Sequence, residues 1–427
     1  MLDIKFIKEN RDIVEQAIKN KKVIKAVDLD ELISVYEERK DLKKQLDEIN
    51  QKRNVAAQNR AVEEGISLKK EVAIIEAKLV DVEKKYISLM ILLPNIPSAD
   101  TPVGKDESGN KVLRQVGEKP VFDFKPKEHW ELGVDLGLID NEHAANVSGA
   151  RFTYLKGDLA MMQFALLQFG LETVTNEDTL EKIKNDAGLN ISVKPFTAIV
   201  PPVFIKPAVF NRMARLEPKE ERYYIPADDL YLIGSAEHTL GPIHMDEVIP
   251  VEKLPIRYAG YSSAFRREAG AAGKDTRGIL RVHQFDKLEL ESFCLPENSY
   301  QEQELMVAIQ EYIMKALDLP YQVMIVCTGD MGIPDHRQID IETWMPGQNK
   351  YRETHSADLN TTYQSRRLNT RFKNKDGKMD FVHMNDATAI AIGRTLIAIM
   401  ENYQQADGSI KVPKVLQKYM GKSVISK

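Results

Sequence analysis

The chain has 427 residues, 43% apolar and 29% charged, which is enough for two to three domains with at least one sizeable core. It has no apolar run of about 18 residues and no basic start followed by an apolar stretch, so we expect neither a membrane span nor a secretory signal. The net charge of −5 gives no overall signature of a nucleic-acid binder and leaves only a local patch for that role. Two cysteines, Cys294 and Cys327, are too few for a disulfide framework or a four-cysteine zinc site. We therefore expect a cytoplasmic protein without zinc.

A long helical hairpin is predicted near the start of the chain. From about Leu29 to Leu93 there is almost no Gly or Pro, and apolar residues recur at alternating steps of three and four. Gly65 separates the two halves, and Ser67 is placed to cap the second helix. The pattern predicts an antiparallel pair over 29–93 with a turn near residue 65, each helix being about 45 Å long at 1.5 Å per residue.

The outer half of the first helix is basic. Residues 39–60 contain seven Lys or Arg and three Asp or Glu, and this excess of positive charge is suited to binding phosphate groups. The basic positions are Arg39, Lys40, Lys43, Lys44, Lys52, Arg53 and Arg60. Two other interpretations stay open at this point: a solvated helix face, and an intermolecular coiled coil that serves only dimerisation.

The remainder of the chain has the pattern of a mixed α+β domain. The prolines of LPNIP (93–97) end the hairpin, and a connector rich in Gly, Pro and Asp follows. From about Phe122, β-branched and aromatic runs alternate with amphipathic segments. We expect strands at Phe196–Phe204 and Tyr321–Cys327, and helices at Leu159–Thr173 and Thr388–Asn402.

The stretch from Phe265 to Glu289 carries the clearest chemical signal. Two strand-like pieces flank a loop rich in Gly and cations, with Arg266, Lys274, Arg277 and Arg281 beside Glu268 and Glu289. Guanidinium groups bind phosphate oxygens in pairs, so arginines around such a loop suit a polyphosphate. Phe285 is placed to stack on a base. The alternative is a surface hairpin with solvated charges.

This stretch, FRREAGAAGKDTRGILRVHQFDKLE, resembles motif 2 of the seryl-tRNA synthetases, a class II aminoacyl-tRNA synthetase family. The resemblance extends over nearly the whole chain. The hairpin is similar to the family's tRNA-binding arm, FTAIVPPVFIK to motif 1, and GRTLIAIMENYQQADGSIKVPKVLQKYM to motif 3 and the C-terminal segment. The implied fold is α+β, with a helical arm and a catalytic domain of mostly antiparallel sheet flanked by helices. The implied domains are an N-terminal domain over 1–100, a connector over 101–120 and a catalytic domain over 121–427, with motifs at about 194–204, 264–289 and 386–402.

The resemblance implies that serine and ATP form seryl-adenylate, and that the seryl group passes to tRNA(Ser). The family also serylates tRNA(Sec) where the organism has one. Arg266, Glu268 and Arg394 would be catalytic: Arg266 grips the α-phosphate and the serine carboxylate, Arg394 holds the γ-phosphate, and Glu268 accepts from the adenine amino group. Phe285 would stack on adenine. The full implied ATP-binding set is Arg266, Arg267, Glu268, Arg281, Val282, Phe285, Glu353, Thr354, His355, Ser356 and Arg394.

The resemblance also implies the amino-acid pocket, the metal and the assembly. The implied serine-binding set is Ser235, Ala236, Glu237, Arg266, Glu289, Asp386 and Thr388. Rejection of alanine requires buried partners for the serine hydroxyl, which Glu289 and Thr388 would supply. Glu353 and Ser356 would hold Mg²⁺, a cation that prefers oxygen ligands. Motif 1 would form the interface of a homodimer, and no membrane partner is expected.

Several positions depart from the family pattern. Ser235 replaces a threonine, Asp386 stands where an asparagine is common, and Ala357 and Asp358 replace other residues after Glu353. These departures leave two further hypotheses: a paralogue that loads a carrier protein, and an inactive homologue that only binds tRNA. The intact arm argues against the first, and the retained arginines and glutamates argue against the second.

Overall fold

The computed structural model describes residues 1–23, 27–269, 275 and 277–427. The chain divides into two compact units, Met1–Ile96 and Pro97–Lys427. The second unit begins inside the segment predicted as the end of the N-terminal domain, where the Ser98 backbone N–H donates to the His336 carbonyl at 2.7 Å. Within the part of the chain that is described, none of the helices combines the length and apolarity that a membrane crossing requires.

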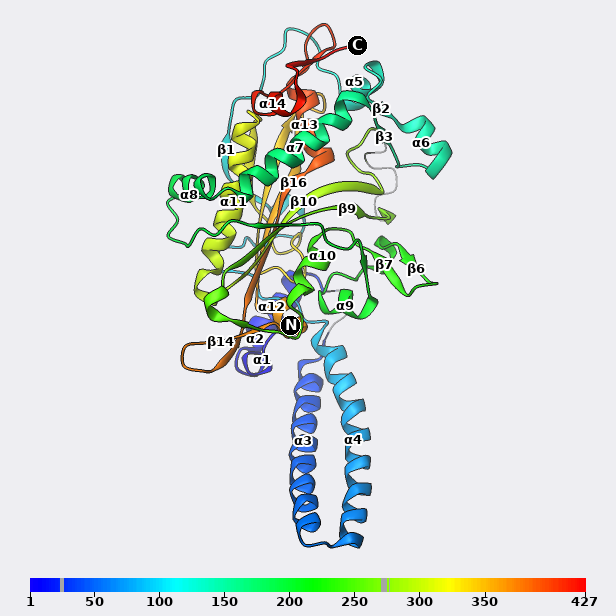
Figure 1. The fold of residues 1–427 in the computed structure, drawn as a ribbon, viewed down its shortest axis with the longest axis vertical. Coiled ribbons are helices and arrows are strands. Elements are labelled where there is room, and N and C mark those ends of the chain that lie inside the picture. Colours follow the sequence, from blue (N-terminus) through cyan, green and yellow to red (C-terminus); the bar gives the residue numbers. More distant parts are fainter. Residues whose placement is uncertain (24–26, 270–274, 276) are drawn as a thin grey trace. The chain divides into compact units, whose positions relative to one another are not determined.

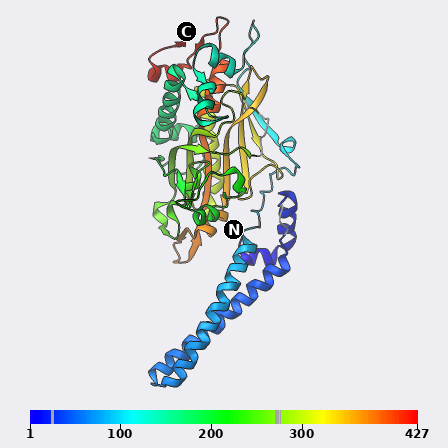
Figure 2. The same ribbon diagram turned by 90° about the vertical axis from the view of Figure 1, so that its right-hand side faces the viewer.

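The first unit is a helical hairpin on a small helical base (Figure 1 and Figure 2). Its helices are α1 (Ile4–Glu9), α2 (Arg11–Asn20), α3 (Leu29–Gln58) and α4 (Val62–Met90). Asp28 caps α3 by accepting the backbone N–H groups of Asp30 and Glu31. Ile7, Leu32 and Met90 are fully buried in the core that joins the base to the hairpin. The predicted pair of long antiparallel helices is therefore present.

The predicted turn near residue 65 is wrong. Helix α3 ends at Gln58 and α4 begins at Val62, so the turn lies at residues 59–61. Arg60 takes the left-handed conformation (φ 55°) that reverses the chain, and the Ala61 N–H donates to the Ala56 carbonyl. Gly65 lies inside α4, where a single glycine is tolerated at a cost of about 1 kcal/mol. The acidic residues of the first turn of α4 favour a helix start before Gly65.

Two of the predicted basic residues of the arm, Arg39 and Lys43, pair with the second helix of the hairpin. The Arg39 guanidinium forms a two-point hydrogen bond with Glu83 of α4 and lies 4.9 Å from the Tyr86 ring centroid. Lys43 also approaches Glu83, at 3.7 Å. The six basic positions other than Arg39 are exposed. Because the second helix supplies this carboxylate, the net positive charge of the arm is smaller than the first helix alone indicates.

An eight-stranded sheet forms the centre of the second unit (Figure 1). Its order is β1 (Lys111–Val116), β11 (Tyr321–Ile325), β12 (Arg337–Met345), β13 (Lys350–Thr361), β16 (His383–Ala391), β10 (Gln284–Cys294), β9 (Ile256–Phe265), β4 (Thr197–Ile199). All neighbouring pairs are antiparallel except β4 and β9, which are parallel. The sheet thus confirms the expected mostly antiparallel core.

The two faces of the sheet differ in chemistry. Helices α7 (Gly157–Thr175), α11 (Ser299–Ala316) and α13 (Ile392–Asn402) share the large apolar core with strand residues such as Leu288 and Leu290. A Cβ at Gly170 of α7 would lie 2.8 Å from Leu288 Cδ2, so the helix approaches the sheet closely there. Alternate residues of a strand point to opposite faces, so Lys287 and Glu289 belong to the other face. That polar face carries the candidate site.

Two sequence-based element predictions need correction. The predicted strand Phe196–Phe204 is split into β4 and β5 (Phe204–Ile205), because Pro201 and Pro202 cannot donate ladder hydrogen bonds. The predicted helix Thr388–Asn402 begins only at Ile392, and Thr388 is on strand β16. Tertiary pairing with β10 holds this segment extended, so Thr388 lies opposite Glu289.

Smaller elements complete the second unit. The further helices are α5 (His129–Asp135), α6 (Asn141–Ser148), α8 (Glu177–Asp186), α9 (Pro207–Arg212), α10 (Glu237–Leu240), α12 (Tyr363–Leu368) and α14 (Gln417–Met420). The further strands are β2 (Ile139–Asp140), β3 (Tyr154–Leu155), β5, β6 (Tyr224–Ile225), β7 (Leu230–Leu232), β8 (Val248–Pro250), β14 (Arg371–Lys373), β15 (Met379–Phe381), β17 (Ile410–Lys411) and β18 (Val424–Ile425). The loop after α9 and the start of α10 border the polar face of the main sheet and supply part of the site.

Candidate active site

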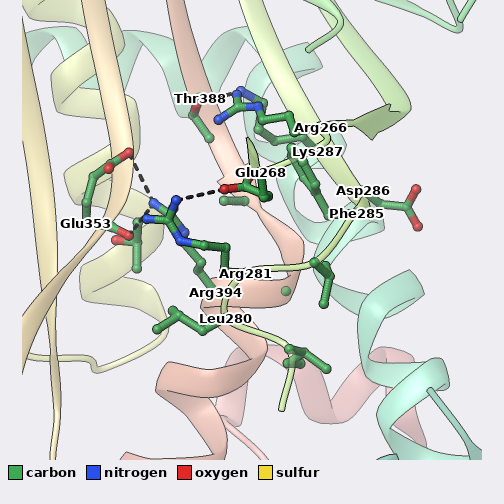
Figure 3. Close-up of a pocket in the computed structure, with 15 residues that line it drawn as sticks. Arg266, Glu268, Leu280, Arg281, Phe285, Asp286, Lys287, Glu353, Thr388 and Arg394 are labelled. Carbon is green, nitrogen blue, oxygen red and sulfur yellow. Dashed lines mark hydrogen bonds and ion pairs between the residues drawn. The ribbon is translucent and has the colours of Figure 1, made fainter. Parts of the chain in front are cut away.

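The candidate site is a cavity over the polar face of strands β10, β13 and β16 (Figure 3). Figure 3 shows Arg281 reaching Glu268 and Arg394 reaching Glu353, while Asp286 points away from the group. Residues of motifs 2 and 3 that are more than a hundred positions apart thus line one cavity. The lining of its outer part is Arg266, Glu268, Ile279, Leu280, Arg281, Val282, Phe285, Asp286, Lys287, Glu353, Thr354, Thr388, Ala391, Gly393 and Arg394.

Two ion pairs hold the arginines of the outer part. Arg281 NH1 donates to Glu268 Oε2 at 2.7 Å, and Arg394 NH1 is 3.2 Å from Glu353 Oε1. Loss of solvent alone would raise the pKa of Glu353, but the cations of Arg394 and Arg266 lower it overall. Glu268 has a left-handed backbone (φ 52°), a strained conformation that persists only where the surroundings fix it.

Arg266 is fixed at the junction of the two parts of the cavity. Its Nε donates to the Gly234 carbonyl at 3.1 Å, and its guanidinium carbon lies 5.2 Å from the Phe285 ring centroid. A Cβ at position 234 would lie 2.9 Å from Arg222 Nη1, so the backbone passes close to this second guanidinium. Burial and the neighbouring Arg394 lower the pKa of Arg266. An arginine held among other cations is prepared to receive an anion.

The inner part of the cavity is a polar pocket and the larger of the two parts. Ser235 Oγ and Thr388 Oγ1 both donate to Glu289 Oε1 at 3.2 Å, and Lys287 forms an ion pair with the same carboxylate. Burial and the nearby Arg266 lower the pKa of Lys287 to about 7. A carboxylate surrounded by two hydroxyls and an amine is suited to a small hydroxylated ligand.

Carboxylates also gather at the base of this pocket. Glu237 accepts from Arg215 Nε at 2.5 Å, and Asp386 Oδ2 accepts from Asn360 Nδ2 at 2.6 Å. Burial and the Glu237 charge raise the pKa of Asp386. Two of the predicted serine-binding residues, Glu237 and Asp386, therefore lie where buried acidic groups are gathered.

Three of the predicted site residues that the structure describes do not line the cavity. Arg267 is exposed and lies over the Tyr223 ring at 6.0 Å, and His355 is buried with its Nδ1 against Thr354 Oγ1 at 2.8 Å. Among the residues that the structure describes, neither lines the outer or inner part, and neither does Ala236, which is buried beside Glu237. The roles assigned to these three stay predictions. Residues 270–274 and 276, in the predicted motif 2 loop, are outside the described residues and include Lys274.

The predicted magnesium ligands fit a hard cation. Glu353 and Ser356 both line the inner part of the cavity and offer only oxygen atoms. Over the ranges described, no group of three or more His, Cys, Asp or Glu side chains is arranged to hold a metal by itself. This donor set matches Mg²⁺ held by one carboxylate together with waters and substrate phosphates.

The sequence reasoning missed several cations of the site, among them Lys287, Arg215 and Arg222. Lys287 lies two residues before Glu289 on one strand, so the period-two pattern of a strand places both on the same face. Arg215 contacts Glu237 from a loop with no recognised motif, and no local signal pointed to it.

Comparison with known proteins agrees with this geometry. Residues 1–97 match the family model of the seryl-tRNA synthetase N-terminal domain, and residues 222–403 match that of the tRNA synthetase class II core domain (G, H, P, S and T). The serine–tRNA ligase of Pseudothermotoga lettingae is 38% identical, with 100% of both chains covered.

Two solved structures are similar over the whole chain. The seryl-tRNA synthetase of Pyrococcus horikoshii complexed with ATP has a TM-score of 0.86 and 34% identity, covering 100% of this chain and 99% of that one. The cytoplasmic serine–tRNA ligase of Naegleria fowleri in complex with AMP has a TM-score of 0.82 and 28% identity at the same coverage. With two domain models and full-length relatives in agreement, the chain belongs to the seryl-tRNA synthetase family.

Proposed function

We propose that this protein activates L-serine with ATP to seryl-adenylate and transfers the seryl group to the 3′ end of tRNA(Ser). One observation carries the proposal: Arg266 lines both the arginine-rich outer cavity and the inner pocket built on Glu289. A guanidinium at that junction contacts the α-phosphate and the serine carboxylate at the point where they react.

Activation is a displacement at the α-phosphorus. The serine carboxylate oxygen forms the new bond, the bond to the β-phosphate breaks, and pyrophosphate leaves. The carboxylate is ionised at neutral pH and needs no general base. Catalysis therefore comes from positioning and from stabilising the developing negative charge. Arg266 acts at the α-phosphate, while Arg281 and Arg394 act on the leaving pyrophosphate. Glu353 and Ser356 would hold Mg²⁺, which would supply charge neutralisation at the phosphates.

Serine is selected through its hydroxyl group. Glu289 is the acceptor for that hydroxyl, with Thr388 beside it at 3.2 Å. Alanine would leave these buried polar groups without a partner, and sites of this kind reject the analogue that lacks the hydroxyl. Glu237 receives the substrate ammonium. The inner pocket thus binds the hydroxyl, the ammonium and the carboxylate of serine.

Phe285 is proposed as the adenine platform, and Phe285→Ala is expected to raise the KM for ATP about 10- to 100-fold, because base–aromatic stacking contributes about 1–3 kcal/mol. The KM for serine should change little, since Phe285 is in the outer part of the cavity. Pyrophosphate exchange at varied ATP is the measurement, and Phe285→Tyr is the control that keeps the ring. An unchanged KM for ATP in Phe285→Ala contradicts the stacking role.

The N-terminal hairpin is proposed as the tRNA-binding arm. Lys44, Lys52 and Arg53 are exposed on α3 and available for phosphate contacts. Recognition of the tRNA would depend on shape and backbone, as is usual for structured RNA. Serylation of tRNA(Sec) and a cytoplasmic location stay predictions from the family.

A homodimer through motif 1 is also proposed. Strand β4 is at the edge of the main sheet, and Val200, which follows it directly, is 81% exposed. Phe204, on edge strand β5 of the three-stranded sheet, is 45% exposed. Apolar side chains at an open sheet edge are suited to a partner chain.

The direct test is charging of tRNA with radioactive serine by the full chain with ATP and Mg²⁺. The expected result is acid-precipitable serine on tRNA(Ser) transcripts and none on transcripts whose 3′ diol has been oxidised with periodate. Serine attached to a carrier protein instead would support the paralogue hypothesis. No serine attached to any acceptor would support the hypothesis of a non-catalytic tRNA-binding module.

A further inference from the structure

One guanidinium at the base of the inner pocket meets four carboxylates. Arg215 Nε is 2.5 Å from Glu237 Oε1, and its NH2 is 3.2 Å from Asp335, 3.6 Å from Asp358 and 3.9 Å from Asp386. These acids come from α10, from the loop before β12, and from strands β13 and β16. Arg215 therefore joins four separate elements at one point.

The fold makes room for this guanidinium. Ala214 has a left-handed backbone (φ 60°), and Arg222 NH2 donates to the Arg215 carbonyl at 2.8 Å. A Cβ at Gly332 would lie 3.0 Å from Arg215 NH1 and 2.2 Å from Asp335 Oδ2. The backbone on both sides is thus shaped around the pair of Arg215 and Asp335.

The charges around Arg215 are unbalanced. Asp335 is 1% exposed, and Asp358, Asp386 and Glu237 are all buried, so four carboxylates meet one guanidinium. Other ionisable groups that influence this cluster electrostatically include the acids Glu291 and Asp340 and the cations Arg222, Arg266 and Lys287. An excess of acidic over basic groups at the end of a pocket favours a ligand that brings a cation, such as an amino-acid ammonium.

We propose that Arg215 is a positioning residue for the substrate ammonium, which holds Glu237 in place and offsets part of the charge of the three aspartates. This inference rests on the proposed function, because Glu237 is the group assigned to the serine ammonium. Arg215 does not itself contact the reacting atoms. It supports Glu237 from the side away from the outer part of the cavity, whose lining does not include Arg215 among the described residues.

A role of this kind predicts a separation of kinetic effects. Removal of the guanidinium leaves Glu237 without its charged partner and leaves the aspartates uncompensated, which weakens a precisely placed ammonium contact. ATP binding uses the outer part of the cavity, and the transferring phosphate is gripped by Arg266. The KM for serine should therefore rise while the KM for ATP and the kcat stay near their original values.

The experiment compares four variants with the full-length protein in serine-dependent pyrophosphate exchange. Arg215→Gln is expected to raise the KM for serine about 30-fold or more, the size of effect seen when one member of a buried charge pair is removed. Arg215→Lys keeps the charge but loses the two-point geometry, so its KM should rise only about 3- to 10-fold. Lys219→Gln is the matched control on the same loop. Lys219 is exposed, so this variant should keep the original KM for serine.

The double variant Arg215→Gln, Asp335→Asn tests charge balance. Removing one carboxylate together with the guanidinium should recover at least about tenfold of the lost serine affinity, because the effects of substitutions at contacting residues are not additive. A purely structural arginine would give equal changes in both KM values and no recovery in the double variant.

The outcomes distinguish failure of the proposed function from failure of the role proposed for Arg215. If the original protein shows no exchange with serine, the proposed function fails. If it does show exchange but Arg215→Gln keeps the original KM for serine, the role of Arg215 is overturned. If Arg215→Gln does not fold, as judged by thermal melting, the double variant is measured alone: a folded double variant supports the charge-balance role, and an unfolded one contradicts it.

Discussion

Arg266→Ala is expected to reduce serine-dependent pyrophosphate exchange by at least about 10³-fold, because it removes the preorganised cation at the point where negative charge develops. The side chain is held by the Gly234 carbonyl and lies against Phe285, so it is aimed before substrate arrives. The loss should appear mainly in kcat. Thermal melting should stay within a few degrees of the original, since the guanidinium points into the cavity rather than into the apolar core.

The neighbouring arginine supplies the matched control. Arg267 is exposed and lies over Tyr223 outside the cavity, so Arg267→Ala should keep exchange within about threefold of the original. Near-normal exchange in Arg266→Ala would refute the site assignment. An equal loss in both variants would mean that the whole segment, and not Arg266 alone, carries the function.

Shortening the arm is expected to separate the two half-reactions. Replacing residues 43–79 with a short Gly/Ser turn keeps the Arg39–Glu83 pair and the core at the base of the hairpin. Charging of tRNA(Ser) should fall by about 10²-fold or more, because the phosphate contacts of the arm are lost. Serine-dependent exchange should stay within about twofold, since none of the described residues of this unit lines the cavity.

A charge variant distinguishes direct contact from loss of shape. Changing Lys44, Lys52 and Arg53 together to Gln keeps both helices and should weaken charging while reducing its dependence on salt concentration. Arg39 is left unchanged because it bonds to Glu83. Normal charging by the shortened protein would show that the arm has no part in tRNA binding, and failure of exchange would show that it is needed for the catalytic unit itself.

The sequence predicted much of the fold because periodicity and proline positions are local signals. The alternation of three and four between residues 29 and 93 indicated both long helices, and the motif stretch indicated strands β9 and β10. The turn was misplaced because the sequence gives Gly65 no distinguishing context, while the left-handed Arg60 is not a residue that pattern rules select. Thr388 was placed on a helix because its local pattern continues into α13, and only pairing with β10 shows that it is on a strand.

Some residues of the site were predictable from the sequence and others were not, for the same physical reason. Arg266, Glu268, Phe285 and Glu289 lie in one motif, so their joint presence in a cavity was predictable. Arg215 and Asp335 gain their meaning only from the fold, which brings a loop after α9 against the segment before β12. A buried cluster assembled from four elements leaves no spacing for the sequence to reveal.

The central claim is that this protein forms an adenylate with serine in particular. Pyrophosphate exchange by the purified protein with ATP, Mg²⁺ and each of serine, threonine, alanine and glycine, without tRNA, tests it most directly. Exchange is expected with serine, with alanine at least about 10³-fold less efficient because Glu289 and Thr388 would lose their partner. Absence of exchange with all four amino acids, in a folded protein, would contradict the claim.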